Sequence, residues 1–266
     1  MGVPPIWVIS LPQAVARRDA VARRLTAAGL PFELLDAVDG NALGASDLAR
    51  YSEMRALYRL GRGLTHGELA AALSHMHAYE RMLREGRDHV VVLEDDAVPM
   101  PGLADVLESV SSLPGDWDVL TLHSTFASAG PEPIGISIGT GAFEVCTYRR
   151  MVYGAVGYLV RRRAARRLVE VGYPIFFPAD DLLTRAKPAG LRIYGVEPAP
   201  VGHEGGPSEV GRATRRKSVG HVSWPLRSGV VVAGKVVRHL PSATRAAPRP
   251  RSRTAGIDDE QTTAGR

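Results

Sequence analysis

The chain has 266 residues, 45% hydrophobic and 23% charged, a composition typical of a globular protein with a sizeable core. A single cysteine, Cys146, excludes an intrachain disulfide and paired-cysteine metal sites, and no run approaches the roughly 20 apolar residues of a membrane-spanning helix. Residues 1–206 carry 21 Lys and Arg against 24 Asp and Glu, whereas residues 207–266 carry 12 against 4. A mildly acidic body is therefore expected to precede a strongly basic tail.

Strands and helices alternate along the first 206 residues. Short apolar runs bounded by turn residues predict the strands. The predicted strands are residues 6–9, 32–40, 90–93, 117–122, 153–160 and 192–196.

The segments between these strands predict helices. The first helix ends near Gly29, and a charged stretch to about residue 63 predicts short helices and loop. Thr65 and Glu68 match the capping box, so a helix is predicted to start there, and apolar residues recur at helical spacing through about Leu83. Residues 161–172 predict a later helix.

This alternation predicts an α/β domain over residues 1–206 with a mainly parallel central sheet, which would bind ligands at the carboxyl ends of its strands. The pattern decays afterwards. Residues 207–240 are a basic extension in which 228–240 predicts a short amphipathic helix, and residues 241–266 are predicted to be disordered. The N-terminus has neither a basic region nor a long apolar run, so no signal peptide is expected.

Three consecutive carboxylates, Glu94, Asp95 and Asp96, follow the apolar strand at 90–93. Like charges this close repel one another unless a cation or hydrogen-bond donors offset them. Oxygen ligands of this kind bind a divalent metal, which can neutralise a diphosphate and stabilise its departure as a leaving group. The alternative is that the acids cap a following helix and are otherwise solvated.

Asp180 and Asp181 repeat this pattern after an apolar run. One interpretation is a helix N-terminus with aspartate as its cap. The other is a second acidic element that faces the first and supplies a general base for an acceptor hydroxyl. From these residues alone, both interpretations remain open.

Arg17, Ser74, His75 and His203 are further candidates. A guanidinium group suits phosphate oxygens, although arginines on exposed helix faces are common. Histidines on helices are more often structural than functional, and His203, in a glycine-rich loop, is either a metal ligand or of no special role. GxGxxG, the P-loop pattern and GxSxG are all missing, so dinucleotide-binding, P-loop and serine hydrolase interpretations have no motif.

Five segments carry a family resemblance, in chain order. They are IWVISLPQAVARRDAVARRL with LPFELLDAVDG, LTHGELAAALSHMHAYERML, HVVVLEDDAVP, YGAVGYLVRRRAARRLVE, and PADD. Together they cover roughly residues 5–210 and resemble glycosyltransferase family 25, the lipooligosaccharide galactosyltransferase family related to procollagen galactosyltransferases.

The resemblance implies a GT-A-like, Rossmann-type sandwich with helices on both faces of the sheet. It also implies an inverting transfer of galactose or glucose from a UDP-sugar to a glycan or lipid-linked acceptor. The expected cofactor is Mn²⁺ or Mg²⁺, with Glu94, Asp95 and Asp96 in place of the DXD motif. Asp96 is the first choice of metal ligand, joined by Glu94 and His203, and the catalytic base is Asp180 or Asp181.

The resemblance also implies a set of donor-binding residues, with Arg17 as a donor-phosphate contact. They are Ser10, Leu11, Arg17, Ala37, Asp39, Gly40, Ser74, His75 and Asp95. Ser10 stands where the family usually has Asn, and Ala70 and Ala71 replace a Gly-Cys pair. These departures leave the expected fold intact but weaken any inference about which sugar is bound.

Other interpretations compete with this one. The chain is alternatively a non-catalytic GT-A-like module that binds carbohydrate or acts as a scaffold in cell-envelope biosynthesis. A nucleotidyl or phosphoryl transferase would use the same acids, but no phosphate-cradling glycine loop is present. The basic tail predicts a peripheral contact with the inner face of an anionic membrane in a cytoplasmic protein, or else a solvated tail, and no nucleic-acid partner is expected.

Overall fold

The computed structural model describes residues 2–113, 117–123, 130–148, 154–184 and 190–204, together with Val230, Val231, Ala233 and Gly234. Its elements follow one another in the order given next. They are β1 (Ile6–Ser10), α1 (Val15–Ala27), β2 (Phe32–Asp36), α2 (Ala45–Ala49), α3 (Glu53–Leu60), α4 (His66–Arg84), β3 (His89–Glu94), β4 (Ala97–Pro99), α5 (Leu103–Ser109), η1 (Val110–Ser112), β5 (Val119–Thr121), β6 (Pro131–Ile138), β7 (Phe143–Tyr148), β8 (Gly157–Arg161), α6 (Arg162–Gly172), α7 (Ala179–Thr184), β9 (Ile193–Glu197) and β10 (Val201–His203).

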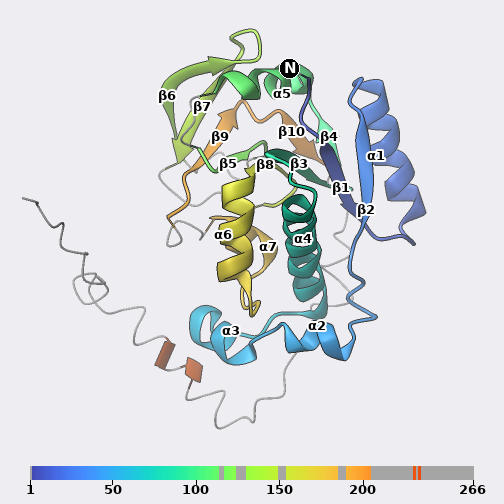
Figure 1. Cartoon of the computed structure of the whole chain (residues 1–266), viewed down its shortest axis with the longest axis vertical. Helices are drawn as coiled ribbons and strands as arrows, with labels where there is room; N and C mark the ends of the chain where they lie inside the picture. Colours follow the sequence, from blue (N-terminus) through green and yellow to red (C-terminus); the bar gives the residue numbers. More distant parts are fainter. Residues whose placement is uncertain are drawn as a thin grey trace, which may run out of the picture.

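Eight strands form one sheet in the order β2-β1-β3-β8-β5-β9-β7-β6, while β4 and β10 form a separate two-stranded sheet (Figure 1). β1 is parallel to β2 and β3, and β5 is parallel to β9. β8 is antiparallel to β3 and β5, and β7 is antiparallel to β9 and β6. Only β8 and β7 therefore run against the other strands of this sheet, which confirms the predicted α/β class with a mainly parallel central sheet.

Helices cover both faces of this sheet, as expected. Side chains alternate along β3: Val90 and Val92 face a core shared with α4, α6 and α7, whereas Val91 and Leu93 face a core shared with α1 and α5. Because both faces are covered, four successive residues of β3 are buried, which explains its continuous apolar run.

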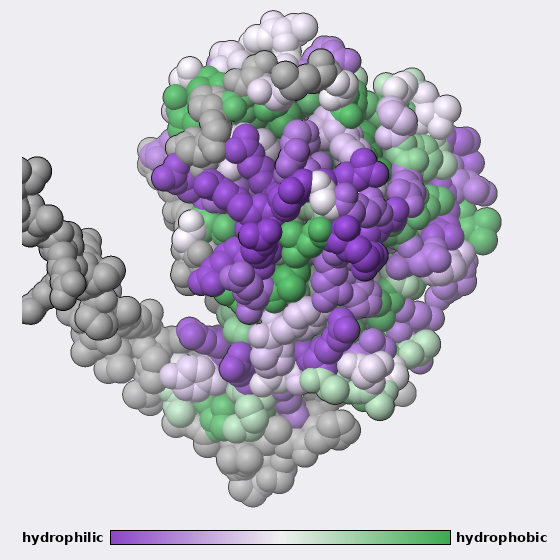
Figure 2. All heavy atoms as spheres, viewed as in Figure 1, coloured by the Kyte–Doolittle hydropathy of each residue, from purple (hydrophilic) through white to green (hydrophobic). Residues whose placement is uncertain are grey.

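Helix α6 is amphipathic and packs beside α4 (Figure 1). Ala164, Ala165 and Leu168 are buried against the sheet, and Arg163 and Arg166 are exposed. The outer surface on this side of the molecule is accordingly largely hydrophilic (Figure 2). This helix therefore closes one core without contributing an apolar surface patch.

The start of α4 is the predicted capping box. The Thr65 hydroxyl accepts a hydrogen bond from the Glu68 backbone at 3.2 Å, and the Glu68 carboxylate accepts one from the Thr65 backbone at 2.8 Å. Arg62 donates to both oxygens of Glu68, at 2.8 and 2.7 Å. The cap fixes where the helix begins and therefore which of its residues face the sheet edge.

The hairpin of β6 and β7 was not predicted. Strand β6 lies at the edge of the sheet, is mostly exposed, and contains Pro131, Pro133 and Gly135. Proline is tolerated in edge strands because no ladder hydrogen bond is required on the outer side. An exposed edge strand has no alternating apolar pattern, so the pattern that predicted the other strands is missing here.

The basic extension lies mostly outside the described residues. Of the helix predicted over residues 228–240, the structure describes Val230, Val231, Ala233 and Gly234, all helical. The segment predicted to be disordered, residues 241–266, lies outside the described residues. In the part of the chain that the structure describes, no helix has the length and apolar character needed to cross a bilayer.

Candidate active site

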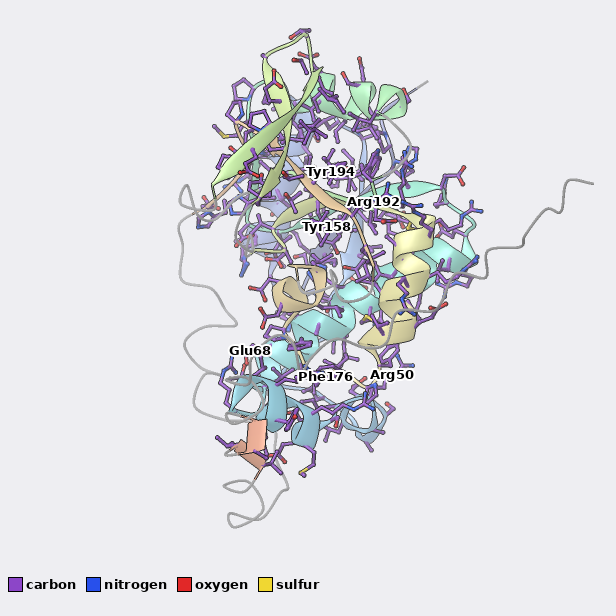
Figure 3. All side chains as sticks on the ribbon, turned by 90° about the vertical axis from the view of Figure 1, so that its left-hand side faces the viewer. Arg50, Glu68, Tyr158, Phe176, Arg192 and Tyr194 are labelled. Atoms are coloured by element: carbon purple, nitrogen blue, oxygen red, sulfur yellow. The ribbon has the colours of Figure 1, made fainter. Side chains whose placement is uncertain are left out.

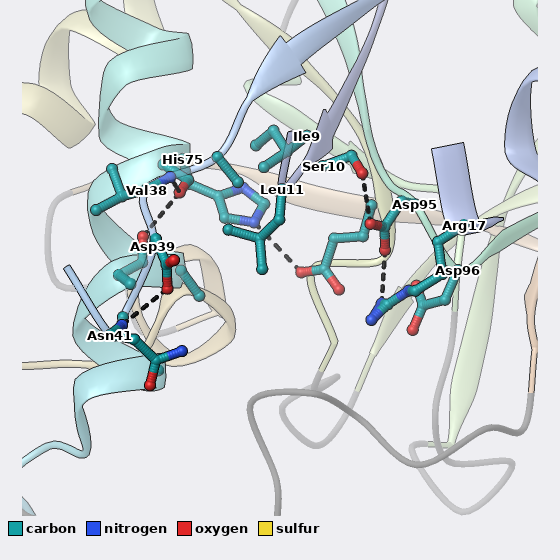
Figure 4. Close-up of a pocket in the computed structure, with 17 residues that line it drawn as sticks. Ile9, Ser10, Leu11, Arg17, Val38, Asp39, Asn41, His75, Asp95 and Asp96 are labelled. Carbon is teal, nitrogen blue, oxygen red and sulfur yellow. Dashed lines mark hydrogen bonds and ion pairs between the residues drawn. The ribbon is translucent and has the colours of Figure 1, made fainter. Parts of the chain in front are cut away.

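The parallel strands β1, β2 and β3 end at the same edge of the sheet. Ser10 of β1 is in register with Asp36 of β2, and Ile9 with Glu94 of β3. A pocket opens at this edge, between the strand ends and α4 (Figure 4). It is lined by Ile9, Ser10, Leu11, Arg17, Ala37, Val38, Asp39, Gly40, Asn41, Gly67, Ala70, Ala71, Ser74, His75, Glu94, Asp95 and Asp96. All the residues predicted to bind the donor line this one pocket, as do two of the three predicted metal ligands.

Asp95 is held by two partners inside this pocket. The Ser10 hydroxyl donates to Oδ2 at 2.6 Å, and the Arg17 guanidinium is 2.6 Å from Oδ1 (Figure 4). Asp95 is 6% exposed, so these contacts offset a charge that is largely removed from water. Asp95 therefore anchors the strand ends and places Arg17 at the pocket wall.

Asp96 differs from its neighbour in having a buried oxygen without a partner. Among the described residues, its Oδ1 makes no hydrogen bond. Burial raises the pKa of Asp96 to about 6, the negative charges of Glu94 and Asp95 add to this rise, and Arg17 and His203 oppose it. A buried carboxylate oxygen without a partner is energetically unfavourable in the isolated protein, and a bound cation would remove the penalty.

We expect Asp96→Asn to stabilise the metal-free protein at about pH 8. The pKa of Asp96 is higher in the folded than in the unfolded protein. The side chain therefore contributes most to folding stability at pH values below its unfolded pKa, and this contribution is lost as the pH rises through about 6. Each pKa unit corresponds to about 1.4 kcal/mol, and partial exposure reduces the effect to about 1–2 kcal/mol.

Urea denaturation in chelator at about pH 8 and about pH 4 measures this difference. The gain should be present at the higher pH and absent at the lower. The control is Asp88→Asn, which removes an exposed carboxylate paired with Arg162 just before β3. Equal or lower stability of Asp96→Asn at about pH 8 would show that Asp96 is not an unfavourable buried charge.

Glu94 is held from behind by a buried histidine. His75 Nε2 lies 3.3 Å from Glu94 Oε1, and the His75 ring is 2% exposed (Figure 4). Ser74, next to His75 on α4, accepts a hydrogen bond from the backbone of Val38 at 2.8 Å. The serine therefore ties the segment after β2 to α4, while the histidine contacts the acidic cluster.

The rim of the pocket is a turn built on Asp39. One carboxylate oxygen accepts from the Asn41 backbone at 2.8 Å, and the other accepts from the Gln13 side chain at 2.8 Å. A Cβ on Gly40 would lie 3.1 Å from backbone atoms of His66 and Gly67. Glycine at this position allows the rim to approach the N-terminus of α4 closely.

Asp180 and Asp181 line a second pocket. They lie in the first turn of α7, which begins at Ala179, so they stand at a helix N-terminus as one interpretation predicted, but inside the helix rather than at its cap position. Arg62, Glu68, Ala71 and Glu94 line the same pocket. Burial raises the pKa of Asp180, and the charges of Asp181 and Glu94 add to the rise, while backbone hydrogen bonds oppose it. Glu94 and Ala71 line both pockets, so the two acidic elements meet at Glu94.

His203 lies beside the acidic cluster rather than in the lining of either pocket. Its strand β10 pairs with β4, which places His203 opposite Ala97, and its ring packs edge-on against His123 at 5.3 Å. The His123 ring is buried and its Nδ1 is 2.9 Å from the Val201 carbonyl. The sequence interpretation missed His123, because nothing in its local pattern sets it apart.

The carboxylates fit a divalent metal only as part of a larger ligand set. Within the described ranges, no three His, Cys, Asp or Glu side chains converge as a ready-made metal site. Mg²⁺ and similar ions are commonly held by one or two carboxylates, with waters and substrate phosphates completing the shell. That arrangement suits Glu94 and the Asp96 oxygen that has no partner in the described part of the chain.

Several lining residues were not predicted, although a signal for them exists on α4. Gly67, Ala71, Ser74 and His75 follow helical spacing and share one face of the helix. Once Ser74 and His75 are candidates, that spacing points to the others. The small side chains at Gly67 and Ala71 leave room for a ligand between α4 and the strand ends.

Comparisons with known proteins agree with the sequence motifs. Residues 3–127 match Glycosyltransferase family 25 (LPS biosynthesis protein). A Glycosyltransferase 25 family member of Aedes aegypti is 29% identical over 182 residues, covering 64% of this chain and 28% of the relative. Procollagen galactosyltransferase 2 of Mus musculus is 30% identical over 196 residues, covering 69% of this chain and 30% of the relative.

Several relatives are described as inactive or probably inactive. The Probable inactive glycosyltransferase 25 family member 3 of Rattus norvegicus is 27% identical over 215 residues, covering 74% of this chain and 38% of the relative. The chain thus spans about a third of the length of these three relatives. The matches confirm the resemblance to glycosyltransferase family 25.

Proposed function

We propose that this relative of glycosyltransferase family 25 is an active, metal-dependent glycosyltransferase that transfers galactose or glucose from a UDP-sugar, with inversion, to a glycan or lipid-linked acceptor. The observation that carries the proposal is the pair of adjoining pockets that share Glu94. One pocket holds Arg17 and the carboxylate triplet, which suits a diphosphate and its cation, and the other holds a carboxylate with a raised pKa. The name of the mouse relative supports galactose as the sugar.

Asp180 is the proposed general base. The acceptor oxygen would form a bond to the anomeric carbon while the bond from that carbon to the diphosphate oxygen breaks. The proton of the acceptor hydroxyl would pass to the Asp180 carboxylate, and the electron pair of the broken bond would leave with UDP. Burial raises the pKa of Asp180 above its usual range, which makes it a stronger base than an exposed aspartate.

Asp96 and Glu94 would hold Mn²⁺ or Mg²⁺. When bound, the ion would neutralise the diphosphate and stabilise the departing UDP. Arg17, fixed by Asp95, lies at the wall of the same pocket and is proposed to contact a phosphate oxygen. Asp95 would act through Arg17 and Ser10 rather than by touching the donor.

A non-catalytic carbohydrate-binding or scaffold module is the second candidate. The observation in its favour is that the rat relative is named as probably inactive. Against it, Asp96 has a buried oxygen that makes no hydrogen bond to any described residue, which is unfavourable in a protein that binds no cation there.

Release of UDP from UDP-galactose and UDP-glucose in Mn²⁺ tests the proposal. We expect slow donor hydrolysis that stops in excess EDTA, and calorimetric UDP binding that requires Mn²⁺. GDP-mannose is the control donor and should not react. Metal-dependent UDP binding without turnover of any donor would favour the module, and the absence of UDP binding would reject the proposed donor site.

A further inference from the structure

We propose that Tyr79 and Tyr158 are positioning residues that fix the tautomer of His75, so that its Nε2 proton is always directed at Glu94. The inference deepens the proposed function, because Glu94 is the carboxylate shared by the two pockets. His75 and Tyr79 lie one helical turn apart on α4, and Tyr158 projects from β8 into the core between the sheet and that helix (Figure 3).

The four side chains form a continuous hydrogen-bonded chain. The Tyr79 and Tyr158 hydroxyls are 2.8 Å apart, the Tyr158 hydroxyl is 2.7 Å from His75 Nδ1, and His75 Nε2 is 3.3 Å from Glu94 Oε1. The Tyr158 and His75 rings stack at 5.7 Å between centroids. Both tyrosines and His75 are buried, so water does not compete for these groups.

The direction of the protons follows from the two ends of the chain. Burial raises the pKa of both tyrosines, so each hydroxyl keeps its single proton. If Tyr79 donates to Tyr158 and Tyr158 donates to Nδ1, a neutral His75 carries its proton on Nε2 and donates it to the Glu94 carboxylate. In this arrangement every contact has one donor and one acceptor.

The opposite arrangement of the protons is unfavourable at both ends of this hydrogen-bonded chain. A proton on Nδ1 would leave the Nε2 lone pair facing a carboxylate, which places two acceptors 3.3 Å apart. The Tyr79 proton would then have no acceptor among the described residues. A buried polar group left unpaired is unfavourable enough to favour the first arrangement by about fivefold or more.

As a consequence, the Glu94 side chain is held in one position in the site. This side chain is only partly buried and lines both pockets, so without a partner it could adopt several rotamers. The Nε2 proton holds Oε1 at one place, and the tyrosines hold the ring that carries the proton. Partners that orient a ligating or catalytic group in this way typically contribute about 10- to 100-fold to activity or metal affinity.

Tyr158→Phe tests the proposal, because it removes the hydroxyl and keeps the ring stacked on His75. In the wild-type protein, ¹⁵N NMR should show Nε2 protonated and Nδ1 unprotonated, with the signals assigned by their loss in His75→Gln. In Tyr158→Phe only the contact with Glu94 still selects the tautomer, so we expect a measurable Nδ1-protonated fraction that the wild type lacks and a roughly 10-fold lower kcat/KM. Tyr79→Phe, which removes the outer donor, should shift both measurements in the same direction and provides a second variant if the first does not fold.

Tyr148→Phe is the matched control. This tyrosine is also buried, and its hydroxyl bonds Glu197 at 3.1 Å instead of His75. It should leave the His75 tautomer and kcat/KM unchanged. A wild-type His75 protonated on Nδ1, or a Tyr158→Phe variant with the wild-type tautomer, would overturn the proposal. Since the tautomer is read without substrate, it decides the matter even if no UDP-sugar is turned over and the proposed function fails.

Discussion

Replacing Asp96 with asparagine is expected to lower kcat/KM for sugar transfer by roughly 10³-fold while leaving the protein folded. Asparagine preserves the shape of the side chain and removes the charge that would hold the cation. A metal contributes several kcal/mol of charge stabilisation at a departing phosphate, and each 1.4 kcal/mol corresponds to a tenfold rate effect. The Oδ1 atom has no hydrogen bond among the described residues, so an amide group in its place breaks no hydrogen bond of that atom.

The measurement is initial-rate kinetics across a Mn²⁺ titration, combined with calorimetry of UDP binding. The variant should bind UDP no better with Mn²⁺ than in EDTA. Asp88→Asn is again the control, because it removes a carboxylate just before β3 and should retain full activity. Full activity of Asp96→Asn, or of the wild type in saturating EDTA, would refute the metal assignment.

Replacing Asp180 with asparagine is expected to lower kcat for transfer by about 10²- to 10⁴-fold, the range typical of general-base catalysis. Donor binding should persist, because Asp180 lines the second pocket and not the one that holds Arg17 and Asp95. The variant should therefore keep metal-dependent UDP binding while losing transfer to the acceptor. That combination separates it from Asp96→Asn.

The pH profile supplies the second measurement for Asp180. A base works only when deprotonated, so wild-type kcat should fall as pH falls through the raised pKa of Asp180. The asparagine variant should lose this limb of the profile. Asp181→Asn is the matched comparison: it should keep this limb but move it to lower pH, because the charge of Asp181 contributes to the raised pKa of Asp180. If Asp181→Asn is the more damaging change, the base is Asp181, and if neither variant loses activity, the base lies elsewhere.

Much of the fold was readable from local patterns. The capping box at Thr65 marked the start of α4, and the apolar runs marked β1, β2 and β3. Parallel order of these strands brings their carboxyl ends to one edge, so the residues predicted to bind the donor could be expected together before any side chain was placed. The hairpin of β6 and β7 was not predicted, because an exposed edge strand containing prolines lacks the alternation of apolar and polar residues that indicates a strand.

The sequence indicated only in part which of the three consecutive acids has which role in the pocket. Asp95, predicted to bind the donor, has both oxygens engaged by Ser10 and Arg17. Asp96, the first choice as metal ligand, keeps a buried oxygen free of hydrogen bonds within the described residues. Neighbouring carboxylates are chemically alike in a sequence, and their partners come from other strands and helices.

The sequence by itself determined the class of this protein: an α/β sheet with a carboxylate cluster at the end of a buried strand and a second acidic element later in the chain. Local periodicity and strand-end position suffice for this, because both depend on residues close together. Only the tertiary structure decided that the two elements meet at Glu94, and that a tyrosine 64 residues beyond it, Tyr158, bonds the histidine behind it. That neighbourhood depends on the antiparallel register of β8 against β3 and on how α4 packs over both. Register and packing result from the whole core, and no short stretch of sequence encodes them.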